Sequence, residues 1–148
     1  MDPESELAGF VAKFAPDLQE QIWGCRAALR RRFPRALELV YDNYNFFVIG
    51  YGPTARTSEA VFSLAAYAKG VNLCFLQHGP ELPDPTGILR GGGKVVRTVR
   101  LASPADLERA DVVALMDAEV ALASIPMSTA VGPELIIKSV SAKQRPRH

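Results

Sequence analysis

Several common signals are missing from this sequence of 148 residues. No apolar run reaches the roughly 20 residues that cross a bilayer, so we expect no membrane partner. The first twenty residues contain acids and no continuous apolar stretch, so they do not resemble a secretory signal. The two cysteines, Cys25 and Cys74, are too few for a disulfide framework. Together these absences favour a small globular protein of the reducing cytoplasm.

An excess of positive or negative charge is also missing. The chain has 17 Lys and Arg against 16 Asp and Glu, and the net charge of +1 gives no overall attraction to nucleic acid or acidic membrane. Basic residues cluster only locally, between Arg26 and Arg35 and in the C-terminal tail. Neither cluster carries an aromatic stacking platform or an RNA-binding signature. We therefore expect solvated basic surfaces and no nucleic acid partner.

The chain is long enough to bury a core, and 48% of its residues are hydrophobic, so we predict one domain over residues 1–148. A first helix should begin at Asp2-Pro3, because Pro suits the first helical position. A second should begin with Asp17 as its cap and end at Phe33-Pro34. Its predicted buried stripe is Leu18, Ile22, Cys25 and Leu29, with Gln19, Arg26 and Arg30 facing away.

Short strands should follow between Glu38 and Leu101, because β-branched and aromatic residues become frequent there. The predicted strands are Val48–Tyr51, Val61–Tyr67, Val71–Gln77 and Val95–Leu101. Short links favour antiparallel pairing. A helix from about Pro104 to Ala123, a short strand over 135–140 and a basic tail over 142–148 complete the chain. The tail has no apolar anchor, and we expect it to be mobile or held only by a neighbour, so that its deletion leaves thermal stability nearly unchanged. The predicted fold class is α+β, a mainly antiparallel sheet flanked by N-terminal helices and one C-terminal helix.

The span from about residue 17 to 122 resembles the YdhG-like family, also called domain of unknown function 1801. The matching segments are Phe33-Pro34, Tyr51-Gly52-Pro53, the strands around Ala66–Phe75, and Leu82 to Arg97 with its Gly-Lys-x-x-Arg element. Within the family the chain is similar to a subgroup carrying Tyr41–Asn45, Val48–Tyr51 and Ile136–Ser141.

This resemblance implies a compact α+β fold with an antiparallel sheet backed by helices, and it implies no particular activity. Some relatives are frataxin-like and associated with iron, so an iron-binding or iron-chaperone protein is an alternative function. Its ligands would be sought among Asp2, Glu4, Glu6, Asp17 and Glu20. The same acids all lie in first helical turns, where the helix dipole alone favours them.

The segment Gly91–Lys94 suggests a phosphate-binding loop, but it lacks the P-loop pattern. That pattern needs Gly where Ile88 stands and Ser or Thr where Val95 stands. Two interpretations remain: a flexible loop, or an anion site formed by loop amides with Lys94 and Arg97. Arg97 alternates with Val99 on a strand face, where a cation needs either a ligand or a carboxylate partner. We expect Arg97 to have the structural role and Lys94 the ligand role.

The segment Tyr41–Asn45 packs phenols, amides and a carboxylate into five consecutive positions. Such groups suit a small polar ligand, and they equally suit a turn, since Asp and Asn stabilise turns with their side chains. Cys74 and His78 would lie about 13 Å apart on a strand, too far to share one metal ion. We predict no metal site and no cofactor.

Our leading hypothesis is a ligand-binding or partner-binding domain without its own catalysis, with a small anionic ligand or a protein as partner. The site would lie where the Tyr41–Asn45 segment meets the Gly91–Lys94 loop. Its predicted residues are Tyr41, Asp42, Tyr44, Asn45, Tyr51, Lys94 and Arg97. The enzyme alternative would use Asp42 or Glu59 as a general base on an anionic substrate, with no catalytic residue assigned. The oligomeric state is left open.

Overall fold

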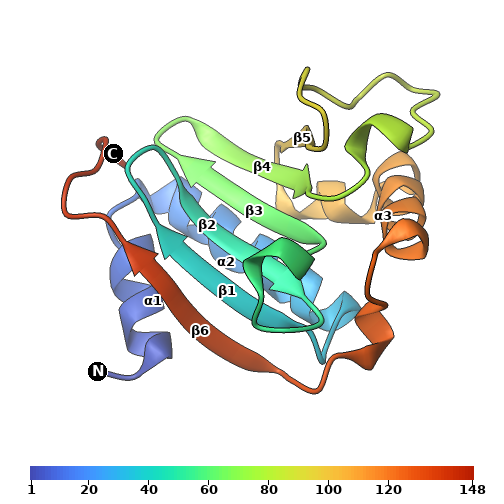
Figure 1. Ribbon diagram of the computed structural model, residues 1–148. Helices are drawn as coiled ribbons and strands as arrows, with labels where there is room; N and C mark the ends of the chain where they lie inside the picture. The colour runs from blue at the N-terminus through green and yellow to red at the C-terminus, as the bar shows by residue number, and fades with distance from the viewer.

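The computed structural model describes residues 1–148 and has one mixed six-stranded sheet with helices on one side (Figure 1). The strands lie in the order β5-β4-β3-β2-β1-β6. Their bounds are β1 Leu37–Asp42, β2 Phe47–Gly52, β3 Phe62–Tyr67, β4 Gly70–Phe75, β5 Arg97–Leu101 and β6 Glu134–Val140. All neighbours pair antiparallel except β1 and β6, which are parallel. The predicted α+β class is confirmed.

Two helices, α1 (Pro3–Val11) and α2 (Pro16–Arg32), cover one face of the sheet (Figure 1). Asp2 caps α1 as expected, accepting a hydrogen bond from the Ser5 amide at 2.9 Å. The cap predicted for the second helix is wrong, because α2 begins at Pro16, and its cap lies two residues before Asp17. Its capping residue is then Ala15, which has no side-chain acceptor to offer.

The core lies between these helices and the sheet. Phe14 at the turn between α1 and α2 packs edge-on against Phe47 of β2, with ring centroids 6.0 Å apart. Phe62 and Phe75 make a similar contact across β3 and β4 at 5.8 Å. The predicted α2 stripe is buried throughout: Leu18, Ile22, Cys25 and Leu29. Burial of these apolar groups supplies most of the stability of the fold.

The opposite face of the sheet carries no long helix (Figure 1). The short 3₁₀ helix η1 (Thr57–Glu59) lies in front of it. Strand pairing places Gly50, Ser63, Cys74 and Thr98 in one cross-strand row on this face. Ser63 and Cys74 are nevertheless buried. The middle of this face is therefore lined by small side chains.

The C-terminal half differs slightly from expectation. The predicted helix from Pro104 to Ala123 is split into a 3₁₀ turn, η3 (Pro104–Glu108), and α3 (Ala110–Leu122). The break is at Arg109, whose backbone is extended, with φ −63° and ψ 140°. None of the helices combines the length and apolar composition needed to cross a bilayer.

The long connection from β4 to β5 is held against the sheet at several points. A short 3₁₀ helix, η2 (Gly79–Glu81), follows β4, and its Gly79 amide donates to the Val95 carbonyl at 2.8 Å. Farther on, Arg90 and Thr98 exchange two backbone hydrogen bonds of 2.8 Å. Two positions before the Gly-rich stretch, Gly79 and Arg90, are thus tied to residues at or just before the start of β5.

Gly79 is required by this close approach. A Cβ added there would lie 2.6 Å from the Arg97 backbone nitrogen and 2.8 Å from the Val95 carbonyl oxygen. We predict that Gly79→Ala lowers the free energy of unfolding by about 2 kcal/mol, because the backbone must shift to relieve the overlap. Urea unfolding measures this. Gly92→Ala is the matched control, since nothing lies within 4 Å of a Cβ at that position. An equal loss in both variants would contradict the packing explanation.

Candidate functional site

Two carboxylates of β1, Glu38 and Asp42, are buried under the helices. Both belong to the strand face that also presents Val40 to the core, because side chains alternate along a strand. Only 4% of Glu38 and none of Asp42 is exposed. A buried charge requires compensation by opposite charge or hydrogen bonds. Each carboxylate is compensated by cations from a different part of the chain.

Glu38 is bound by Arg26 of α2 and by Tyr51 of β2. The Arg26 guanidinium donates to both carboxylate oxygens, at 2.9 and 3.0 Å, and the Tyr51 hydroxyl donates at 2.8 Å. Arg26 also donates to Glu4 of α1, at 2.7 and 3.1 Å. One guanidinium therefore joins α1, α2 and the sheet.

This network corrects two predictions. Arg26 does not face away from the core, because its position four residues after Ile22 places it on the buried side of α2. Burial acts to lower the pKa of Arg26, but hydrogen bonds to Glu38 and Glu4 outweigh it and raise the pKa. Tyr51 cannot line a ligand site, since it is fully buried. Burial, reinforced by Glu38, raises its pKa well above the usual value and keeps the hydroxyl protonated as a donor.

Asp42 is bound by residues from the two ends of the chain. Lys13, between α1 and α2, donates to one oxygen at 2.5 Å, and Arg147 of the C-terminal tail donates to the other at 3.0 Å. Arg147 also donates to the Asn43 carbonyl at 2.6 Å. Its side chain is 2% exposed, and its Nε and Nη1 atoms lack a partner. This contact secures the last residues of the chain to the sheet.

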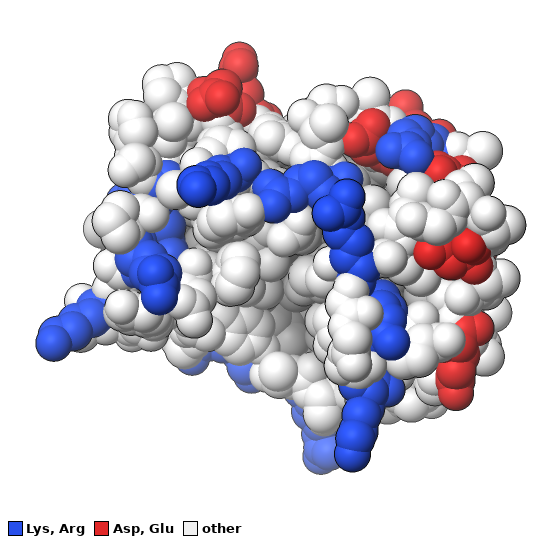
Figure 2. All heavy atoms as spheres, turned by 90° about the horizontal axis from the view of Figure 1, so that it is seen from above, with Lys and Arg blue, Asp and Glu red and all other residues white.

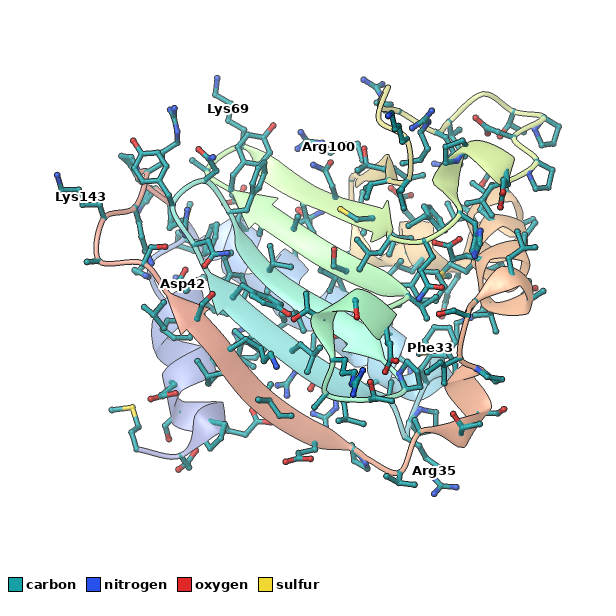
Figure 3. The ribbon with its side chains drawn as sticks, in the orientation of Figure 1. Phe33, Arg35, Asp42, Lys69, Arg100 and Lys143 are labelled. Atoms are coloured by element: carbon teal, nitrogen blue, oxygen red, sulfur yellow. The ribbon has the colours of Figure 1, made fainter.

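The prediction of a mobile tail is therefore wrong. Besides Arg147, the tail contacts the hairpin between β1 and β2 through Gln144 and Arg145. The Gln144 amide donates to the Asp42 carbonyl at 2.8 Å, and Arg145 donates to the Asn45 side chain at 2.8 Å. The tail needs no apolar anchor because polar and charged contacts hold it. Figure 3 shows Asp42 beneath this end of the chain.

The Tyr41–Asn45 segment is accordingly a strand end and a hairpin turn, and the chain's own tail covers much of it. Asp42 is paired with Phe47, and the pairing continues from Phe47 across the sheet to Leu101, the last residue of β5. The Gly91–Lys94 loop precedes the first residue of β5. The two segments therefore lie at opposite ends of the sheet, with β2, β3 and β4 between them. They do not form one site, contrary to prediction.

Lys94 and Arg97 also differ from the prediction. Lys94 is exposed and forms no side-chain hydrogen bond or ion pair. Arg97 does not pair with a buried carboxylate: it donates to the carbonyls of Gly93 and Val96, at 2.6 and 2.9 Å. Since its partners are backbone acceptors, Arg97 shapes the Gly-rich loop.

The other predicted candidates are dispersed. Burial raises the pKa of the Cys25 thiol to about 12 and also raises that of Cys74, so both are poor nucleophiles at neutral pH. His78 contacts Glu81 at 2.7 Å. Hydrogen bonding to Arg26 lowers the pKa of Glu4. No three His, Cys, Asp or Glu side chains come together in an arrangement able to hold a metal ion.

A pocket of about 300 Å³ lies beside β5, near the predicted anion loop but lined by different cations. Its lining residues are Gly87, Ile88, Arg90, Val99, Arg100 and Arg109. Arg109 is held by Asp111, and Arg100 donates to the Lys69 carbonyl at 3.2 Å. The Arg90 side chain has no protein partner. We call these six residues the arginine pocket.

The face of the molecule that is uppermost in Figure 1 is predominantly basic. Figure 2, which views the molecule from above, shows Lys and Arg on both sides of a hollow, with Asp and Glu gathered at the margins. Sequence analysis missed the pocket because its arginines are spread over about twenty residues. The one available signal was the density of Arg between positions 90 and 109.

Comparison of the chain with protein-family models, with curated proteins and with solved structures gave no match.

We predict that Arg147→Met destabilises the protein by about 2–4 kcal/mol, because Asp42 then retains Lys13 alone as a cation in a buried setting. Deleting residues 142–148 should lower the free energy of unfolding by at least as much. Thermal and urea unfolding of both variants provide the measurement. Lys143→Gln, in the exposed part of the tail, is the control and should behave like the parent. Unchanged stability in the deletion would show that the tail contacts add nothing.

Proposed function

We propose that this chain is a binding domain without its own catalysis, and that it takes a small anionic ligand in the arginine pocket. The observation that carries the proposal is the presence of three guanidinium groups around one pocket, of which Arg90 is unpaired. Guanidinium groups match the geometry of phosphate and carboxylate oxygens, to which they donate paired hydrogen bonds. The pocket volume, about 300 Å³, suits a ligand with one or two such groups.

The local backbone supports this assignment. Gly87, with φ of +67°, ends a turn closed by its own amide on the Asp84 carbonyl at 3.2 Å. The Asp84 carboxylate then accepts from the amides of Ile88 and Leu89, at 3.0 and 2.9 Å. This turn fixes the direction in which the chain enters Arg90. A fixed backbone beside the pocket lowers the cost of ordering Arg90 on a ligand.

The two candidate bases of the enzyme alternative, Asp42 and Glu59, are engaged elsewhere in the fold. Asp42 is fully buried and neutralised by two cations, and Glu59 accepts a hydrogen bond from Thr54 at 2.6 Å. Neither carboxylate lines the arginine pocket. A cytoplasmic location and the resemblance to the YdhG-like family are parts of this proposal.

The test is thermal unfolding with phosphate, pyrophosphate or citrate, compared at matched ionic strength with sodium chloride. A ligand that binds only the folded state raises the melting temperature, by about 5–10 °C at roughly 100 times its Kd. Arg90→Gln should abolish this rise and leave the unliganded melting temperature unchanged, because Arg90 has no partner to lose.

Lys94→Gln is the matched control, since Lys94 is another exposed cation a few residues away. It should retain the full ligand response. If Lys94→Gln abolishes the response while Arg90→Gln keeps it, the ligand binds the Gly-rich loop and the pocket assignment is wrong. If sodium chloride gives the same rise as the anions, there is no specific site.

A further inference from the structure

The end of the sheet that carries the hairpin turns brings exposed aromatic side chains together with cations. The turn after β1 contributes Tyr44 and Phe46, which are 49% and 38% exposed. The end of β3 contributes Tyr67, whose ring lies edge-on to Phe46 at a centroid distance of 5.7 Å. Tyr44 and Tyr67 are far along the sequence from the arginines that lie over them, and become their neighbours only through strand pairing and docking of the tail.

Cations lie over two of these three rings. Arg100 of β5 lies over Tyr67, 5.1 Å from the ring centroid, and Arg145 of the tail lies over Tyr44 at 5.5 Å. Lys69 occupies the turn between β3 and β4, and Lys143 precedes Arg145; both are exposed. Figure 3 shows Lys69 and Lys143 projecting outward at this end of the molecule. We call Tyr44, Phe46, Tyr67, Lys69, Arg100, Lys143 and Arg145 the hairpin-end surface.

This surface has no acidic counterpart of its own. The segments Asn43–Phe46, Tyr67–Gly70 and Ser141–His148 contain no Asp or Glu. The nearest carboxylate along the chain, Asp42, is buried and already paired with Lys13 and Arg147. Positive potential at the hairpin-end surface is therefore not cancelled locally, even though the net charge of the whole protein is only +1.

From this arrangement we infer that the hairpin-end surface binds single-stranded nucleic acid. Unpaired bases stack on aromatic rings and on guanidinium planes, while Lys and Arg neutralise the phosphates between them. Tyr44 with Arg145 and Tyr67 with Arg100 each supply a ring and a cation in contact. A small anion would need the cations alone, and a folded acidic protein would not need exposed rings on a turn. The inference is independent of the proposed function, since the two sites share only Arg100.

The experiment measures fluorescence anisotropy of labelled oligo(dT) and oligo(U) of about twelve nucleotides, together with a duplex of the same length. Both single strands should bind more tightly than the duplex, whose bases are not free to stack. Comparison of the affinities for oligo(dT) and oligo(U) shows whether DNA or RNA is preferred. The slope of log K against log salt should be about −2 to −3, as expected when four cations contact phosphates.

Phe46→Leu and Tyr44→Leu keep an apolar side chain but remove the ring, and each should weaken binding roughly tenfold. The double variant Lys69→Gln/Lys143→Gln should weaken binding and reduce the magnitude of the salt slope by about 1.4, because two phosphate contacts are lost. Arg31→Gln, an exposed cation at the end of α2, is the control and should bind like the parent. Arg90→Gln should also bind within about twofold, which separates this surface from the arginine pocket.

Two results would overturn the inference. One is tight binding that both aromatic variants retain, with inorganic polyphosphate competing as well as the oligonucleotides do. The surface would then recognise charge alone. The other is no anisotropy change with either single strand at low salt, in a protein whose unfolding curve is normal.

Discussion

The fold depends on placing two carboxylates, Glu38 and Asp42, on the buried face of one strand. Neither is tolerated there without a cation, so each determines which other segment must lie against β1. Glu38 holds Arg26 of α2 against β1, and Arg26 in turn binds Glu4 of α1. Asp42 holds Lys13 and Arg147, near the end of the tail, against the same strand. Helix packing and the path of the C-terminus are thus consequences of charge compensation as well as of apolar burial.

This arrangement also explains which surfaces remain available for binding. The tail contacts the end of β1, α1 lies against β6, and α2 lies against β3 and β4. At the β5 edge of the sheet, Arg90 and Arg100 remain exposed. The tail has two effects. Arg147 is buried and forms an ion pair with Asp42, whereas Lys143 and Arg145 remain exposed beside the hairpin turn. The same segment therefore stabilises the fold and adds positive charge to its surface.

The sequence predicted the secondary structure well where periodicity is strong, as in the buried α2 stripe of Ile22, Cys25 and Leu29. It failed for β1, where Leu37, Leu39 and Tyr41 alternate with Glu38 and Asp42. The ordinary interpretation of such alternation places the carboxylates in solvent. Their burial depends on Arg26 and Arg147, which are 12 and 105 residues distant from their partners. No pattern within a short stretch of sequence indicates ion pairs between residues so far apart. The arginine pocket and the hairpin-end surface escaped prediction for the same reason, since strand pairing assembles both.

The central claim is most directly tested by a double-mutant cycle on Arg26 and Glu38, with unfolding free energy as the readout. We predict that Arg26→Met and Glu38→Gln each cost about 3 kcal/mol, because each leaves its partner's charge or donors uncompensated in the core. The double variant should cost clearly less than the sum, with a coupling energy above about 1.5 kcal/mol. Small and additive losses, below about 0.5 kcal/mol each, would contradict the account and show that apolar packing alone positions the helices.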